Sequence, residues 1–320
     1  MCPDVQHFHC LILYGDKYMD LNVIYVTIVR FFYQVSGDGK ETWARIDKTS
    51  YCSTTAIDDA SLVLQEIVAS LHSFNILVEQ VKAGKGQFEI VLGYTDCGRA
   101  ANNLIITHEV VKGVARKHGL LASFTPRYYN NNVCPQSYAH STDDDVGSGS
   151  HVHISLFKNG ENIFMASGEP NSYERLIPKA RNSSFICWGI ECKELPVRAC
   201  CPPGVPNGVV TNFEMKTFDG SANPHLGLAS IIIAGIDGMR RKLPIPGPVE
   251  PESYDFDWNN DDIKLPWSLR CAIIHMDSDK WFNEMLGKEF ICTRGGVVGE
   301  EIGHDFCGGD EKYKHIMFNY

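Results

Sequence analysis

The chain has 320 residues, of which 44% are hydrophobic and 21% are charged, and its formal net charge is −10. This balance is typical of a globular protein with a sizeable core, and the length fits one large domain or two smaller ones. No run of lysine and arginine interleaved with aromatic residues stands out, so we expect no nucleic-acid partner. An acidic protein that handles phosphates must gather its cations locally or borrow metal ions.

The cysteines and the N-terminus indicate a reducing compartment. The 12 cysteines are scattered and lack the paired spacing of a zinc site. Residues 1–9 show no basic stretch followed by an apolar one, so the sequence predicts no secretory signal. The apolar segment 21–35 contains Arg30 and Gln34 and is shorter than the ~20 residues that span a bilayer. We therefore expect a cytoplasmic protein with free thiols and no membrane partner.

Hydrophobic periodicity predicts alternating strands and helices in the first half of the chain. The predicted elements are, in order, a strand over 23–33, a helix over 56–74, a strand over 88–92, a helix over 99–118 and a strand over 120–128. In the first helix Leu64, Ile67 and Leu71 share one buried face. Gly119 is a natural stop for the second helix.

A long polar loop over 129–150 follows, and it carries three consecutive aspartates at 143–145. A loop of this length is usually functional or mobile, and the aspartates fit a solvated loop or a metal site. The elements predicted after it are strands over 151–157, 163–165 and 209–218, helices over 226–243 and 268–286, and a helix near the C-terminus. Asn159-Gly160 predicts a hairpin between the first two of these strands. Without regular βαβ alternation, the pattern favours an α+β fold with an antiparallel sheet.

Three of the predicted strands have one apolar face and one unusually polar face, because successive side chains in a strand point to opposite sides. The polar faces carry Gln87 and Glu89 in one strand, His151, His153 and Ser155 in the second, and Asn212, Glu214 and Lys216 in the third. Such faces are common on solvated sheets. Carboxylates and imidazoles aimed at one cavity favour a divalent-metal or phosphate site instead.

Five ordered motifs between residues 40 and 241 resemble those of the glutamine synthetase catalytic domain. They are GQFE at 86–89, GSGSHVHISL at 147–156, PNSYER at 170–175, NFEMK at 212–216 and SANPHL at 221–226. The segment 219–225 is most similar to the plant nodulin or FluG-like branch. The resemblance implies an α+β fold whose curved antiparallel sheet lines an active-site funnel, with helices outside and a single catalytic domain over 1–320.

The resemblance also implies an activity. Members of the family make glutamine from glutamate, ammonia and ATP, through a phosphorylated glutamate carboxylate. The cofactors are Mg²⁺ or Mn²⁺, with ATP as co-substrate, because the metals offset the charge of the transferring phosphoryl group. The family's ring of subunits further implies a homo-oligomer.

By the same resemblance, individual residues take on roles. The implied metal ligands are Glu89, His151 and Glu214. The residues implied for ATP or phosphate binding are His153, Arg198, Lys193 and Lys216, and those for substrate are Gly149, Asn171 and Arg175. Arg175 and Arg198 are the implied catalytic residues. Lys193 and Lys216 stand where arginines are usual, and lysine lacks the bidentate fork of arginine.

Several family features are missing from this chain. Val26-Thr27-Ile28 stands where a Glu-x-Glu strand is expected, and 81–85 lacks the glutamate expected before GQFE. Glu169 joins Pro170 directly, which indicates an internal deletion near 169–170 and poor packing there. Residues 1–39 match poorly, we expect the N-terminal β-grasp domain to be absent, and 250–320 is predicted to be a C-terminal helical part. We therefore predict a ligase with impaired activity. The alternatives are a non-catalytic binding or interaction protein and a damaged gene product that is not stably folded.

Overall fold

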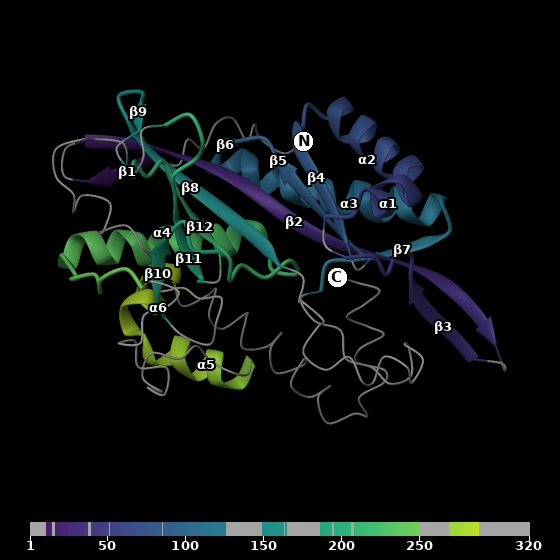
Figure 1. Cartoon of the computed structure of the whole chain (residues 1–320). Coiled ribbons are helices and arrows are strands. Elements are labelled where there is room, and N and C mark those ends of the chain that lie inside the picture. The colour runs from purple at the N-terminus through teal and green to yellow at the C-terminus, as the bar shows by residue number, and fades with distance from the viewer. Residues whose placement is uncertain are drawn as a thin grey trace, which may run out of the picture.

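The structure, a computed structural model, is built around one sheet (Figure 1). It describes residues 11–14, 17–37, 40–50, 52–84, 86–125, 149–162, 164, 186–193, 195–205, 208–249 and 269–287. The strands are β1 Leu11–Tyr14, β2 Lys17–Gly37, β3 Lys40–Arg45, β4 Val78–Gly84, β5 Gln87–Leu92, β6 Thr95–Asp96, β7 Leu120–Ser123, β8 Ser150–Lys158, β9 Glu161–Asn162, β10 Trp188–Ile190, β11 Val197–Cys200 and β12 Asn212–Met215. The helices are α1 Thr54–Asp59, α2 Ser61–Ser73, α3 Cys97–Lys117, α4 Pro224–Arg241, α5 Leu269–Ser278 and α6 Lys280–Leu286.

The long strand β2 is the spine of the sheet, whose order is β10-β11-β12-β8-β2-β5-β4. Its β-branched and aromatic residues suit a strand with at least one buried face. Val23, Tyr25 and Phe31 on one face are at most 1% exposed. Its other face carries Ile24, Val26 and Ile28, of which Val26 is buried. Beyond the sheet's centre β2 continues into a hairpin with β3 (Figure 1).

The predicted antiparallel sheet is correct for every pair of described strands except β10 and β11, which run parallel. The chain turns at Glu191, whose φ is 51°, and the second strand then runs alongside the first in the same direction. Hydrophobic alternation reports which residues share a face, but it carries no information on strand direction. The sheet is therefore mixed, with its one parallel pair at an edge.

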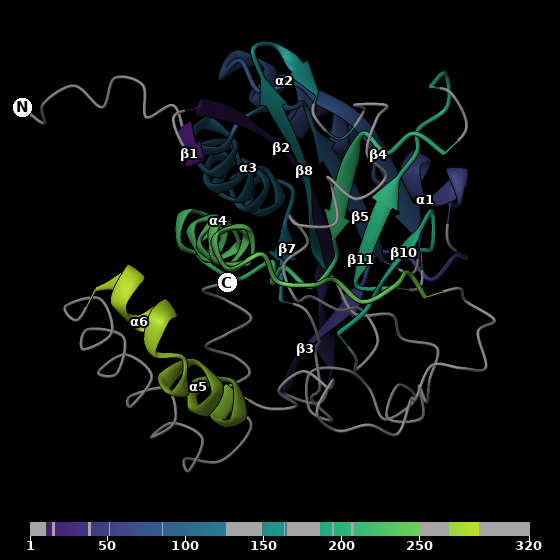
Figure 2. The same cartoon turned by 90° about the vertical axis from the view of Figure 1, so that its left-hand side faces the viewer.

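Helices α2, α3 and α4 cover the face of the sheet to which Val23 and Phe31 point. Leu71 of α2, Leu104 of α3 and Leu228 of α4 belong to the same buried core as the strand residues. Figure 2 shows α3 and α4 lying side by side on that face, in agreement with their direct contacts. The opposite face, with the polar side chains, carries none of these three helices.

Two predicted helices are each divided in the structure. The helix expected over 56–74 is split at Ala60, which ends α1 and begins α2. The helix expected over 268–286 is interrupted at Asp279, whose side chain accepts a hydrogen bond from the Phe282 amide and so caps α6. Hydrophobic periodicity and helix-capping residues predict one continuous helix in each case, because a short break of this kind leaves the hydrophobic period almost unchanged.

The strands were predicted with correct type but imperfect ends. The Asn159-Gly160 turn is present, with φ of 53° and 82° as a two-residue hairpin requires. It leads into β9 at 161–162 rather than into a strand at 163–165. The strand predicted over 209–218 covers only 212–215, and the one over 120–128 is described at 120–123. The helix predicted near the C-terminus and the loop at 143–145 lie outside the described residues.

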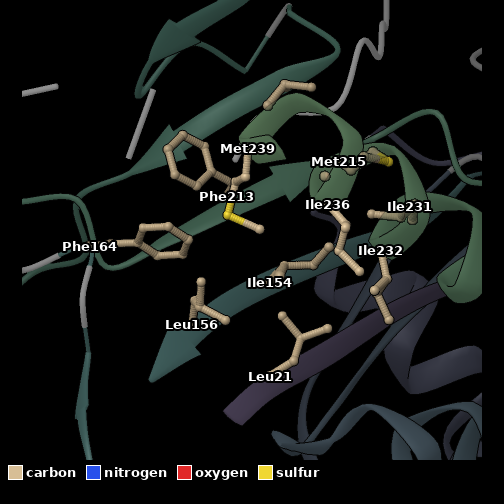
Figure 3. A pocket seen from close by; sticks show the side chains of 12 residues that line it. Leu21, Ile154, Leu156, Phe164, Phe213, Met215, Ile231, Ile232, Ile236 and Met239 are labelled. Carbon is tan, nitrogen blue, oxygen red and sulfur yellow. The ribbon is translucent and has the colours of Figure 1, made fainter. Parts of the chain in front are cut away.

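An apolar pocket of about 550 Å³, partly open to solvent, lies between α4 and the sheet (Figure 3). Its walls come from β2, β8, β11, β12 and α4, together with Phe164. Ile154 and Met215 in these walls are sequence neighbours of His153 and Glu214 on the opposite face of the sheet. None of the helices in the described part of the chain is both long and apolar enough to span a membrane.

Candidate functional site

Polar side chains lie in two groups across the sheet face opposite α2, α3 and α4. Cross-strand register places Arg198 of β11 opposite Glu214 of β12, and Glu214 opposite His153 of β8. Further along, Glu89 of β5 lies opposite Lys82 of β4. We call this set, completed by His151 of β8 and by Lys216, which directly follows β12, the polar band. Five strands, β4, β5, β8, β11 and β12, contribute to it, so only the folded sheet assembles these groups.

Glu214 is the centre of one half of the polar band. Its Oε1 lies 3.1 Å from Nδ1 of His151 and 3.8 Å from Nε2 of His153. Its Oε2 lies 2.9 Å from Nε of Arg198 and 3.9 Å from Nζ of Lys216. The residue is only 5% exposed, so these charges act on one another with little screening by water. The structure thus brings together five residues that the sequence analysis assigned to one site.

The electrostatics of this half keep Glu214 ionised. Burial alone would raise the pKa of Glu214, but the hydrogen bond from His151 and the charges of His153, Lys216 and Arg198 together lower it to about 2. Burial lowers the pKa of His153, and the nearby carboxylate only partly offsets this effect. Nδ1 of His153 lies 2.9 Å from Oδ1 of Asn212, an acceptor that fixes the orientation of the ring.

One oxygen of Glu214 is left without a hydrogen-bond donor among the described residues, namely Oε2. Although Arg198 Nε lies close to it, that N–H donates to the Cys200 sulfur at 3.2 Å, so the contact with Glu214 is an ion pair without a hydrogen bond. A buried carboxylate oxygen in this position can accept a hydrogen bond from a ligand. Burial raises the pKa of Cys200 to about 11, so its thiol stays protonated beside the arginine.

The other half of the polar band is a single ion pair. Nζ of Lys82 lies 2.6 Å from Oε1 of Glu89, and the two side chains are 31% and 15% exposed. Between this pair and the Glu214 half lies β2, where Val26 stands opposite His151 and Ile28 stands opposite Glu89. These are the two positions at which the sequence analysis expected carboxylates. Instead, an apolar strip divides the polar band.

Gly149 is held close to the histidines. A Cβ at this position would lie 3.0 Å from Nε2 of His151, so a larger residue would displace the ring. The Lys193 side chain is exposed, and its backbone carbonyl accepts a hydrogen bond from Nζ of Lys216. The predicted site residues Asn171 and Arg175 lie outside the described residues, as does the junction at 169–170.

The described residues do not fit a metal ion. Across the described part of the chain, no three or more His, Cys, Asp or Glu side chains are grouped so that they could hold one. Glu89 pairs with Lys82, and Glu214 is surrounded by basic groups. Magnesium requires several oxygen ligands in octahedral geometry, and each carboxylate here stands alone among cations.

Comparison with known proteins places the chain in a family. Residues 28–170 and 165–294 match the model of the glutamine synthetase catalytic domain. The chain belongs to the glutamine synthetase family. The prediction of that family from the five motifs is confirmed, whereas the nodulin or FluG-like branch stays a prediction. The two matched parts meet at 165–170, which is also where the sequence analysis expects an internal deletion.

Relatives in the glutamine synthetase family are moderately similar in sequence. Type-1 glutamine synthetase 1 of Dictyostelium discoideum is 28% identical over 277 residues, which cover 77% of this chain and 52% of that protein. Glutamine synthetase of Pyrococcus abyssi is 29% identical over 291 residues, which cover 81% of this chain and 62% of that protein. The chain therefore spans between about half and about three fifths of these relatives.

Solved structures of the glutamine synthetase type share the fold. Apo GmaS superposes with a TM-score of 0.68 at 20% identity, and the match covers 92% of this chain and 72% of that one. Plasmodium falciparum glutamine synthetase superposes with a TM-score of 0.71 at 17% identity, covering 93% of this chain and 75% of that one. The predicted α+β fold is thus supported as a family fold with an open, mixed sheet.

Lys82 is the residue of the polar band that the sequence analysis missed, since it treated 81–85 only as a segment that lacks a glutamate. A signal was present. Gly84 and Gly86 have φ of 157° and 72°, and Gly84 pairs with Gln87 across the hairpin. Counting outward from that pair places Lys82 opposite Glu89 on the same face.

Proposed function

We propose that the chain is a glutamine synthetase-like, ATP-dependent carboxylate–amine ligase whose activity is impaired. In the proposed reaction ATP phosphorylates the side-chain carboxylate of glutamate. Ammonia then displaces the phosphate, giving glutamine, ADP and inorganic phosphate. The observation that carries the impairment is that both proposed carboxylate ligands, Glu89 and Glu214, are paired with the protein's own cations, with Val26 and Ile28 between them.

The Glu214 half supports a phosphate-binding role in this proposal. Arg198 and Lys216 supply positive charge beside the hydrogen-bonded pair formed by His153 and Asn212, and all four lie on the sheet face opposite α2, α3 and α4. Phosphoryl transfer gathers negative oxygens, so fixed cations near them lower the energy of the transition state. Gly149, Asn171 and Arg175 are proposed on the substrate side, and Arg175 and Arg198 as the catalytic arginines.

We include Mg²⁺ or Mn²⁺ in the proposal because the family resemblance implies it. The ion would supply the charge neutralisation that phosphoryl transfer needs. Because the described residues do not fit such an ion, we assign it no step here. We further propose a cytoplasmic location, a homo-oligomer and membership of the nodulin or FluG-like branch, each on the strength of family resemblance.

A second candidate function is a non-catalytic protein that binds a nucleotide or another anionic ligand. The Lys82–Glu89 pair favours this candidate, because an ammonium group on a carboxylate supplies charge but no Lewis acid. Both candidates use the same face of the sheet, and they differ only in whether phosphoryl transfer follows binding.

Turnover and binding measurements test the two candidates together. We expect glutamine formation, measured as phosphate release with saturating glutamate, ammonium, ATP and manganese, to be well below about 1 per second. A rate near or above that value would contradict the proposed impairment. A rise in melting temperature with ATP, without any phosphate release, would favour the non-catalytic candidate, because a ligand of the native state stabilises it by mass action.

A further inference from the structure

One feature of the polar band goes beyond an impaired ligase, namely the ammonium group of Lys82. Its Nζ lies 2.6 Å from Oε1 of Glu89, slightly shorter than the usual range for a charge-assisted hydrogen bond. The two residues are direct cross-strand partners in the β4–β5 hairpin, so the backbone holds the ammonium over the carboxylate. Glu89 thus already has a cation attached to the protein itself.

We propose that Lys82 takes the place of a divalent metal ion at Glu89, so that the polar band binds a phosphate-bearing anion without any metal. A divalent ion would have to displace the ammonium or sit beside it, and like charges at that separation repel. The neighbour of Glu89 on the central strand is Ile28, which offers no oxygen to a metal. The inference rests on the proposed function only in using the same face for phosphate.

The charges of the polar band suit an anion without further help. Around Glu214, Arg198 and Lys216 outnumber the one carboxylate that they both contact, in a chain whose net charge is −10. This local excess of positive charge is the opposite of the acidic cluster that a metal site needs. It draws multiply charged anions such as phosphate or pyrophosphate to this face.

An ordinary surface ion pair is the competing explanation for Lys82–Glu89, and the chain offers a matched control for it. Lys117 of α3 forms an ion pair with Glu66 of α2, away from the polar band. If Lys82 does no more than stabilise the hairpin, then Lys82→Met and Lys117→Met will behave alike. If Lys82 replaces a metal, only changes at residue 82 will alter ion and anion binding.

The test measures binding of two probes to the full chain, Mn²⁺ alone and inorganic pyrophosphate in EDTA. We expect the unmodified chain to bind pyrophosphate in the presence of EDTA. Its binding of Mn²⁺ should be the same as that of Glu89→Gln, because Glu89 holds no metal ion. Lys82→Met should weaken pyrophosphate binding by about tenfold, and Lys117→Met should leave it unchanged. Lys82→Glu should weaken it further and should raise Mn²⁺ affinity by at least about tenfold, because it adds a carboxylate opposite Glu89.

Several outcomes would overturn the inference. They are pyrophosphate binding that requires Mg²⁺, Mn²⁺ binding to the unmodified chain that is lost in Glu89→Gln, and equal effects of Lys82→Met and Lys117→Met. Circular dichroism of each variant checks folding. If Lys82→Glu does not fold, the comparison of Lys82→Met with Lys117→Met decides the test. Pyrophosphate binding only with Mg²⁺ refutes this inference alone. A failure to bind pyrophosphate with or without metal also removes the phosphate site of the proposed function.

Discussion

The two carboxylates of the polar band, Glu214 and Glu89, lie on the same face of one sheet, but their environments are very different. Glu214 is 5% exposed and has two imidazoles, an arginine and a lysine around it. Glu89 is more open and, among the described residues, forms an ion pair with one cation, Lys82. We infer that the contacts of Glu214 contribute to the stability of the fold, whereas the ion pair of Glu89 can be replaced at small cost in stability.

The largest expected effect comes from removing the charge of Glu214. Glu214→Gln leaves Arg198 and Lys216 beside a neutral amide, and breaking a buried ion pair in this way costs about 3 kcal/mol of unfolding free energy. Glu89→Gln, the matched control, should cost less than about 1 kcal/mol because that pair is partly solvated. Urea denaturation of both variants measures this. Equal losses would show that burial does not separate the two carboxylates.

The next effect is a loss of stability in acid. The pKa of Glu214 is lowered to about 2 from its ordinary value of 4.5, so the folded state binds its proton less readily than the unfolded state. The resulting stabilisation is fully present above pH 4.5 and is lost as the pH falls from there to about 2, by an amount on the order of 3 kcal/mol.

Unfolding free energy measured against pH, in the unmodified chain and in Glu214→Gln, isolates this contribution. The variant should lose less stability over that pH window. A curve for Glu214→Gln that parallels the curve of the unmodified chain would show that other carboxylates dominate the acid response.

A smaller effect is expected from rebuilding the divided centre of the polar band. Ile28→Glu alone should leave Mn²⁺ binding weak, because Lys82 can pair with the new carboxylate as well as with Glu89. Combined with Lys82→Glu, it would place three carboxylates on adjacent strands, and Mn²⁺ affinity should rise above that of either single variant. Isothermal titration with Mn²⁺ alone measures this. Strong binding by Ile28→Glu alone would contradict the role assigned to Lys82.

The features of this site that could be predicted from the sequence are those that depend only on residues close together in the chain. The alternation in 87–92, 151–156 and 212–216 correctly identifies the face on which each polar side chain lies, because it depends only on the two-residue period of a strand. The hairpin geometry that pairs Lys82 with Glu89 is also local, and could have been read from Gly84 and Gly86.

Features that depend on distant pairing could not be predicted in this way. Nothing in the spacing of 20–27 and 150–157 indicates that β2 and β8 pair, or that Val26 falls opposite His151. The short strands β10 and β11 have only three and four residues, too few for a period to be recognised. The family resemblance supplied the expected neighbourhood of His151 and Glu214, and their contact distances required the structure.

The pocket beneath α4 has a mechanical consequence. Pressure favours states of smaller volume, and the internal void that unfolding eliminates is the main source of the volume decrease. The half of the sheet under α2 and α3 is filled by side chains such as Phe31, Phe88 and Leu104, which are at most 1% exposed. The half under α4 contains the apolar pocket, whose volume of about 550 Å³ includes space that is open to solvent, so only part of it is internal void. Hydrostatic compression should therefore loosen α4 first, and with it the strands that carry His153 and Glu214, while the other half stays folded.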